Sequence, residues 1–227
     1  MAQRPGGGRR PTPPVVPTPT EPPPGELSTL EKALSSTVHV ALAVEMLRHA
    51  KKLGGRPEKV LEAVDAWHDA AKKIDDAAQN MFSSFNDLGT YWEGPAYGTY
   101  KDFMTNNIKI ADKDFDALVA AGENIIEMYR HVVQACVDRN QAIAKAAIAI
   151  GNNVGYIFGN ENNEETLAIR VALENFAIEY SGIKGTLTTT LSNYQASIKS
   201  LKGTTLSVSP PGGFPPSVRD RSKWEPT

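Results

Sequence analysis

The sequence predicts an all-α protein, an elongated antiparallel helical bundle built on a long helical hairpin. Three observations predict this class. Apolar residues recur with four-three spacing over long stretches, and no strand-type alternation bounded by hairpin turns occurs. Proline is nearly absent from residues 27–202, which contain only Pro57 and Pro95. Because proline removes a backbone donor and clashes with a helix interior, its scarcity over so long a stretch indicates helices.

The first three predicted helices follow from their end signals and their apolar spacing. Residues 27–54 form one helix that the paired glycines Gly54-Gly55 end. Pro57 and Pro95 each begin a helix, since proline suits the first helical position. These helices reach Leu88 and about residue 150, and the second of them would be roughly 80 Å long, which predicts a rod. Their four-three series are Val60, Val64, Trp67, Ala71, Ile74, Ala78, Met81, Phe85 and Leu88, then Met104, Ile108, Ala111, Phe115, Leu118, Gly122, Ile125, Tyr129, Val132 and Cys136.

A fourth helix is predicted after the glycine- and asparagine-rich break at residues 151–163. It starts near Asn163 or Thr166 and ends near Lys202. Gly182 and Gly185 lie within it, and each glycine costs about 1 kcal/mol in a helix interior. The sequence therefore leaves open whether this helix is continuous or kinked.

Proline also sets the predicted domain boundaries. Nine of the 16 prolines lie in residues 1–26 and five lie in residues 203–227, so both segments are predicted to be disordered proline-rich tails. The helical bundle is predicted over residues 27–202, with the hairpin at 57–150 and its turn at 89–95. The first tail could be a ligand for aromatic-lined grooves or a plain spacer, and we favour the spacer.

Composition excludes several classes of function. The formal charge of −2 and the pI near 6.1 give no general reason to bind nucleic acid or anionic lipid. No apolar run reaches the roughly 18 residues that a membrane span needs, so we expect no stable membrane insertion. The single cysteine, Cys136, excludes an intrachain disulfide framework and a cysteine-rich metal site. No apolar segment follows the N-terminal arginines, so we expect no Sec signal peptide.

The sequence contains no arrangement of residues that indicates an enzyme, a metal site or a cofactor. Asp65, His68 and Asp69 share one helical face, but such a set is more often a solvated surface than a metal site. His131 and Cys136 lie five residues apart, about 140° around a helix, so they cannot form a nucleophile pair. We therefore expect a non-enzymatic protein without cofactors or metals.

The segment between the two best apolar series is the most informative part of the chain. Gly89 can end one helix with a positive φ, Gly94 can turn the chain tightly, and Pro95 starts the next helix. A short loop between two such helices predicts an antiparallel hairpin with Trp92 at its apex. Trp92 either caps the hairpin core or serves in recognition; we favour recognition and expect it to be substantially exposed.

Trp92-Glu93-Gly94 between two amphipathic helices resembles the WXG family of helical hairpins exported by type VII secretion systems. Ala96 and Tyr97 roughly match the small and aromatic residues that follow the turn in that family. The additional helices before and after the hairpin are similar to those of the longer PPE-type substrates. The family's Tyr-x-x-x-Asp/Glu export signal is absent from this chain.

The resemblance implies a bacterial, non-enzymatic type VII secretion substrate or partner protein that acts through helix–helix surfaces. It would be secreted without a Sec signal peptide. Its expected partners are another helical protein, in a homo- or hetero-oligomer, and a secretion ATPase. Trp92 and Gly94 would carry the interaction or secretion motif. The alternative is a structural coiled-coil assembly or scaffold module unrelated to secretion. A bundle that opens onto membranes has only the run Ala142–Ile150 in its favour, and Lys145 interrupts it.

Overall fold

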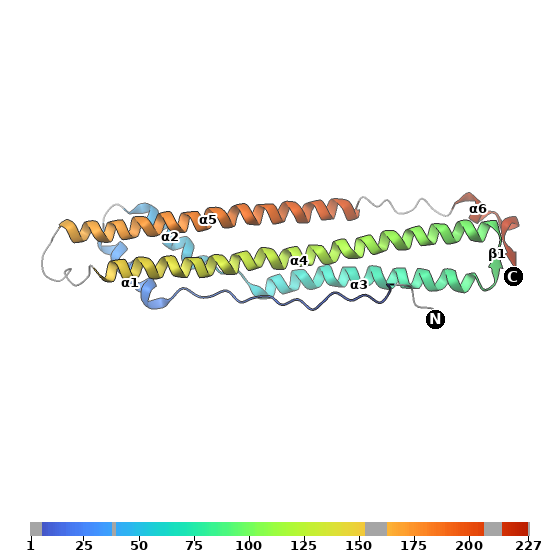
Figure 1. Cartoon of the computed structure of the whole chain (residues 1–227), viewed down its shortest axis with the longest axis horizontal. Coiled ribbons are helices and arrows are strands. Elements are labelled where there is room, and N and C mark those ends of the chain that lie inside the picture. Colours follow the sequence, from blue (N-terminus) through green and yellow to red (C-terminus); the bar gives the residue numbers. More distant parts are fainter. Residues whose placement is uncertain (1–5, 38–39, 153–162, 207–214, 227) are drawn as a thin grey trace. The chain divides into compact units, whose positions relative to one another are not determined.

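The protein is all-α, as predicted. The computed structural model describes residues 6–37, 40–152, 163–206 and 215–226. Within these ranges, most residues lie in the helices α1 (Pro24–Ser36), α2 (Ala41–Lys52), α3 (Pro57–Leu88), α4 (Pro95–Gly151) and α5 (Asn163–Leu206) (Figure 1). The remaining elements are short, namely α6 (Pro216–Arg219), the 3-10 turn η2 (Arg221–Lys223), and the strands β1 (Trp92–Glu93) and β2 (Glu225–Pro226).

Residue contacts divide the chain into two compact units. Unit 1 comprises Met1–Val15, Val60–Ile126 and Gln195–Thr227, and unit 2 comprises Val16–Lys59 and Glu127–Tyr194. Unit 1 contains the turn between α3 and α4 together with β1 and β2. Unit 2 contains α1, α2 and the larger hydrophobic cluster of the described residues.

In unit 1, α3 and α4 pack against each other in antiparallel directions. Phe85, near the end of α3, clusters with Met104 and Ile108, near the start of α4. Farther from the turn, a Cβ atom added to Gly122 of α4 would lie 2.9 Å from His68 Nε2 of α3. Contacting residue numbers therefore fall along one helix as they rise along the other. This confirms the predicted hairpin over the part of it that lies in unit 1.

The apolar series predicted the buried positions of both hairpin helices. On α3 the buried apolar residues are Val64, Ala71, Ala78 and Phe85, which repeat every seven residues. On α4 the same repeat continues through both units, and its buried members include Met104, Ile108, Phe115, Tyr129, Cys136, Ile143 and Ile150. Both helices begin at the predicted prolines, and α4 ends within one residue of the predicted position.

The predicted single helix at 27–54 is wrong, because the structure has two helices there, α1 and α2. Thr37 leaves the helical region with φ −113° and ψ 126°. Its hydroxyl donates to the carbonyl oxygen of Ala33 at 2.8 Å, and the Ser36 hydroxyl donates to the same oxygen at 3.0 Å. Such side-chain bonds compete with the helical backbone, and β-branched residues weaken it further. Val38 and His39 lie outside the described residues.

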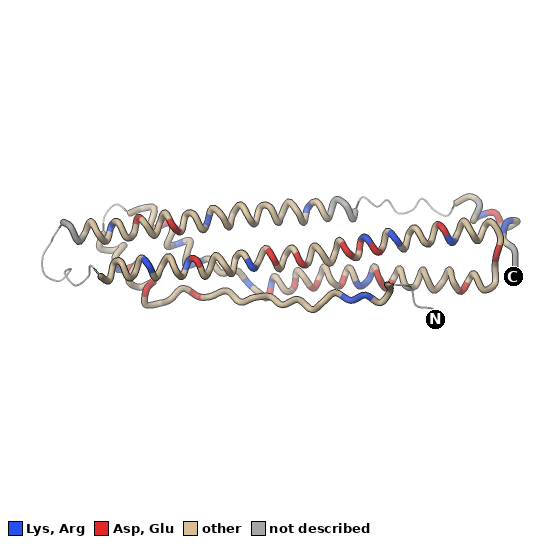
Figure 2. Tube along the Cα trace, viewed as in Figure 1, with Lys and Arg blue, Asp and Glu red and all other residues tan. Residues whose placement is uncertain are grey.

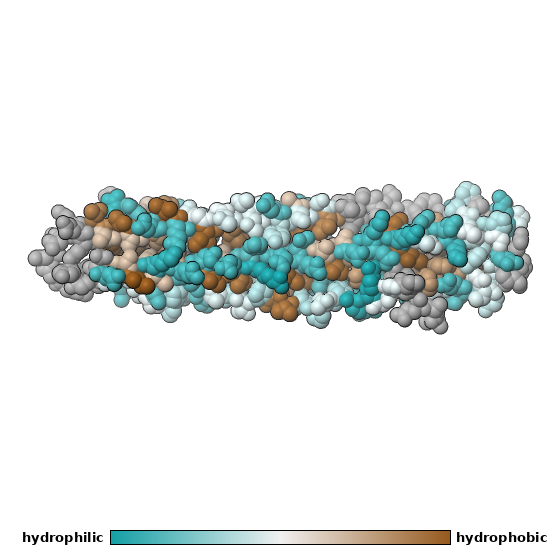
Figure 3. Space-filling model, viewed as in Figure 1, coloured by the Kyte–Doolittle hydropathy of each residue, from teal (hydrophilic) through white to brown (hydrophobic). Residues whose placement is uncertain are grey.

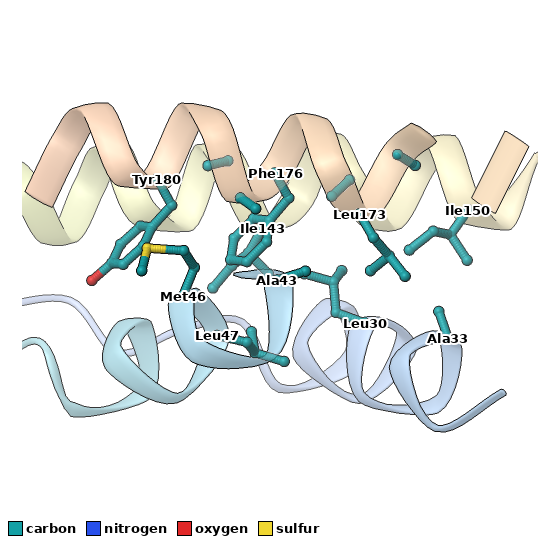
Figure 4. Packing of buried hydrophobic residues seen from close by; sticks show 14 of the residues in the cluster. Leu30, Ala33, Ala43, Met46, Leu47, Ile143, Ile150, Leu173, Phe176 and Tyr180 are labelled. Atoms are coloured by element: carbon teal, nitrogen blue, oxygen red, sulfur yellow. The ribbon is translucent and has the colours of Figure 1, made fainter. Parts of the chain in front are cut away.

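The core of unit 2 forms where α1 and α2 pack against α4 and α5 (Figure 4). In the close-up view Leu30 of α1 points toward the side chains of α4 and α5, and Met46 of α2 lies beside the ring of Tyr180 of α5. Phe176 and Tyr180 stack with their ring centroids 5.9 Å apart. Long apolar side chains from four helices therefore interdigitate, and this burial is the main stabilising contribution to unit 2.

α5 is one continuous helix through Gly182 and Gly185, and it ends at Leu206, four residues beyond the predicted end. A Cβ atom added at either glycine would meet no atom within 4 Å. Among the described side chains of α5, the buried ones are Ile169, Ala172, Leu173, Phe176, Ala177 and Tyr180. Between residues 181 and 194, where all side chains are described, none is buried.

His49 of α2 is hydrogen-bonded to Tyr180 of α5 beside this core. The His49 Nδ1 atom lies 2.9 Å from the Tyr180 hydroxyl oxygen. Burial, followed by the nearby Lys184 ammonium, lowers the pKa of His49 despite the opposing effect of Glu45. Burial raises the pKa of Tyr180 to about 12, so the hydroxyl keeps its proton. The folded chain therefore favours a neutral His49.

We expect acid to destabilise the protein through His49. Because the folded pKa lies below the ordinary value of about 6.5, the unfolded chain binds the proton first, and stability is lost as the pH falls through 6.5. The urea midpoint should fall more between pH 7.5 and pH 5.0 for wild type than for His49→Gln. An equal fall in both proteins would contradict this assignment.

The N-terminal segment, predicted to be a disordered tail, makes defined contacts in both units. In unit 1, Arg9 and Arg10 pair with aspartates of α3 and α4. In unit 2, the amide of Asn140 donates to the Thr20 hydroxyl at 3.1 Å and to the Glu21 carbonyl at 2.8 Å. Helix α1 also begins at Pro24, inside the predicted tail. The structure therefore differs from the prediction, because polar side chains hold a segment with few apolar residues.

Candidate functional site at the α3–α4 turn

The turn between α3 and α4 begins with backbone hydrogen bonds that extend the end of α3. The chain then reverses direction. The amides of Thr90 and Tyr91 donate to the carbonyl oxygens of Asp87 and Leu88, both at 3.1 Å. Trp92 and Glu93 follow in the extended conformation of β1. Gly94 has φ +94°, a conformation that side chains rarely adopt. Gly94 therefore allows the reversal before α4 starts, as predicted for this residue.

Gly89 is needed for a different reason from the one predicted. The expectation of a positive φ is wrong, because the positive-φ glycines of the described residues are Gly6, Gly8, Gly55 and Gly94. A Cβ atom on Gly89 would instead lie 2.1 Å from the Tyr97 hydroxyl oxygen and 2.8 Å from its Cζ. That hydroxyl donates to the Phe85 carbonyl oxygen at 3.2 Å. Tyr97 of α4 thus fits against the end of α3 only because Gly89 has no side chain.

We expect Gly89→Ala to destabilise the chain by about 1–3 kcal/mol, as for overpacked sites. The Tyr97 ring would have to leave its position, and its hydrogen bond to Phe85 would be lost. Gly98→Ala is the matched control, since a Cβ there meets nothing within 4 Å and alanine is the better helix former. Urea midpoints measure both effects. Equal midpoints for the two variants would contradict the fit.

Trp92 is partly buried, so the expectation that it is substantially exposed is wrong. The cause is Trp224, which the sequence placed in a disordered tail. The two indole rings meet edge to face, with centroids 6.1 Å apart and planes at 89°. The strand β2 also pairs antiparallel with β1, with Trp92 opposite Pro226 and Glu93 opposite Glu225. The C-terminal segment therefore covers one side of the turn.

Trp224 is held at the turn by its own segment and by α4. Its Nε1–H donates to the Val218 carbonyl oxygen at 2.9 Å, which fixes the ring relative to α6. Its ring centroid lies 6.5 Å from that of Tyr97 and 6.0 Å from that of Tyr100. Burial raises the pKa of Tyr100, and the neighbouring Tyr97 adds to this effect. Trp92, Tyr97, Tyr100 and Trp224 thus form an aromatic cluster at the turn.

The acidic face of α3 does not assemble into a metal site. Asp65 and Asp69 are exposed, whereas the His68 ring lies against Gly122 of α4, with its Nε2 atom buried and without a hydrogen-bond partner. Among the described residues, no group of three or more His, Cys, Asp or Glu side chains could hold a metal ion.

His131 and Cys136 lie in different surroundings, as their spacing predicted. His131 is exposed, and its Nε2 atom lies 3.4 Å from the Tyr194 hydroxyl oxygen. Cys136 is fully buried, and this burial raises the pKa of its thiol. A buried, protonated thiol is a poor nucleophile.

Sequence reasoning missed three residues that organise the structure. Asp75 and Arg139 are each 1% exposed, and they are the buried charged residues of the described chain. Arg139 lies at an apolar position of the four-three series, between Cys136 and Ile143. A charged residue at such a position could have indicated a buried charge. Asp75 is adjacent to the α3 series, which is a weaker signal. The spacing of apolar residues gave no indication that Trp224 contacts the turn between α3 and α4.

No family model, curated protein or solved structure matches this chain.

Among the described residues, no helix is long and apolar enough to cross a membrane. Hydrophobic side chains interrupt the hydrophilic surface on the face shown in Figure 3. In unit 2 the exposed large ones include Leu42, Ile148, Leu167 and Ile178.

Proposed function

We propose that this protein is a non-enzymatic type VII secretion substrate or partner protein. The observation that carries the proposal is the tripeptide Trp92-Glu93-Gly94, which lies at the turn of an antiparallel hairpin made by α3 and α4. Gly94 with its positive φ and Pro95 at the start of α4 shape this turn. Trp92 and Gly94 are the proposed interaction or secretion motif.

Helix–helix surfaces are the proposed means of partner binding. Leu167 and Ile178 of α5 are 59% and 67% exposed, and Ile148 of α4 is 63% exposed. Exposed aliphatic side chains on helices favour packing against another amphipathic helix. A second helical protein, or a second copy of this chain, would fit such a surface. A secretion ATPase would engage the chain during export, which would deliver the protein outside the cell.

Export from the native host tests this proposal. A tagged full-length chain should appear in the culture medium of the wild-type host and should be absent without the secretion ATPase. Trp92→Ala should lower the exported fraction at least tenfold, because it removes the indole from the motif. Tyr91→Ala is the matched control, since Tyr91 is the neighbouring residue and is 68% exposed.

Intracellular levels and urea midpoints of each variant must accompany the export measurement. They separate a loss of recognition from a loss of folding. Export that persists without the ATPase, or that Trp92→Ala leaves unchanged, would overturn the proposal. That result would favour the structural scaffold module instead.

A further inference from the structure

We propose that α3 and α4 form a binding site for arginine in an extended peptide segment, and that residues 6–10 occupy it as a ligand supplied by the same chain. The proposal is independent of secretion. It rests on the ion pairs that the N-terminal arginines make in unit 1. Figure 2 shows basic and acidic positions along the chain in blue and red.

The guanidinium group of Arg9 contacts carboxylates along the edge formed by its two Nη atoms, and one of its faces contacts an aromatic ring. Its Nη1 and Nη2 atoms each donate at 2.8 Å, to Oδ1 of Asp116 and to Oδ1 of Asp112 respectively. These aspartates are one helical turn apart on α4, so they receive both arms of the fork. The guanidinium carbon lies 4.0 Å from the ring centroid of Phe115, which is buried. Paired carboxylates with an aromatic face are a geometry that suits arginine better than lysine.

The floor of the site is Asp75, whose side chain has no exposed surface. Its Oδ2 atom accepts the Gly8 amide proton at 2.8 Å, and its Oδ1 atom lies 3.8 Å from Arg9 Nε. Arg10 Nη1 also lies 3.8 Å from Asp75 Oδ2. A buried carboxylate is costly unless charge and hydrogen bonds compensate it. The Gly8 amide and the two nearby guanidinium groups therefore contribute to the compensation of Asp75, which favours a basic ligand at this site.

The surrounding groups define which peptide fits. Gly8 has φ +75°, which favours glycine before the first arginine. Arg10 adds an ion pair with Asp76 at 3.0 Å, at the exposed rim. The preferred ligand is therefore a segment with the order Gly-Arg-Arg. Any chain that presents this order could compete with residues 8–10 for the site.

A peptide titration tests the site in the full-length protein. The double variant Arg9→Ala/Arg10→Ala empties the site, and a fluorescein-labelled peptide of residues 6–13 is the probe. We expect saturable anisotropy binding to the double variant and at least tenfold weaker binding to wild type, because the tethered segment competes at high effective concentration. A peptide with both arginines changed to lysine should bind at least tenfold more weakly. Adding Asp112→Asn and Asp116→Asn should abolish binding.

Each contrary result would overturn the proposal. Equal binding of the arginine and lysine peptides would indicate general charge attraction, and equal binding to wild type would show that residues 6–10 do not occupy the site. An absence of binding to the emptied protein would show that no peptide is recognised. If the double variant does not unfold cooperatively, Arg9→Lys replaces it, because it retains the charge and loses the fork. Wild type must again bind at least tenfold more weakly than this variant.

Discussion

Arg139→Met is expected to destabilise the protein by at least about 3 kcal/mol. In unit 2, Arg139 Nη1 donates to the carbonyl oxygens of Ala50, at 3.2 Å, and Leu53 at the C-terminal end of α2. Its Nη2 atom donates to the carbonyl oxygen of Thr20. Methionine fills a similar volume but donates no hydrogen bond, so these acceptors lose their donor. Each such loss costs about 1–3 kcal/mol when the group is buried.

Arg130→Met is the matched control on the same helix. Arg130 pairs with Glu127, and its side chain is 55% exposed, so its removal should cost less than about 1 kcal/mol. Urea unfolding curves of both variants and wild type measure the difference. Similar midpoints for the two variants would show that Arg139 does not fasten the end of α2.

Phe176→Ala is expected to cost about 3–5 kcal/mol, the range for truncation of a buried aromatic residue. Phe176 is 2% exposed and lies in the cluster formed by α1, α2, α4 and α5. Its removal leaves a cavity and ends the stacking with Tyr180. Because net stabilities of domains are only about 5–15 kcal/mol, this single change should remove a large part of the margin.

Ile178→Ala tests the same helix on its opposite face. Ile178 is 67% exposed and only two residues from Phe176, so we expect a change within about 0.5 kcal/mol. The measurement is the urea midpoint together with the slope of the transition. A comparable loss for both residues would mean that the two faces of α5 are buried to a similar extent.

The sequence predicted the elements whose signals are local. Apolar residues at four-three spacing, proline at a helix start and glycine at a turn all act within a few residues, so α3, α4 and the turn at Gly94 were predicted closely. The same spacing did not show the break between α1 and α2. There, hydroxyl groups of Ser36 and Thr37 compete for backbone carbonyls without altering the apolar pattern.

The residues that sequence reasoning missed depend on partners far away in the chain. Asp75 accepts a hydrogen bond from Gly8, 67 residues earlier, and Arg139 donates to Thr20, 119 residues earlier. No spacing rule connects such pairs. Proline-rich composition indicated a solvated N-terminal segment, but composition does not show whether one or two charged residues in it meet complementary groups.

The distribution of buried residues along α5 bears on how this helix opens. Tyr180 is the last buried residue among the described side chains of α5, and Gly182 and Gly185 then add backbone freedom to a stretch in which no residue of 181–194 is itself buried. Segments with few buried contacts open locally at a smaller free energy than the core. Amide protons of residues 182–194 can therefore exchange with solvent through fraying that leaves Leu173 and Phe176 packed. This part of α5 is therefore expected to open at a smaller free energy than the part that carries Leu173 and Phe176.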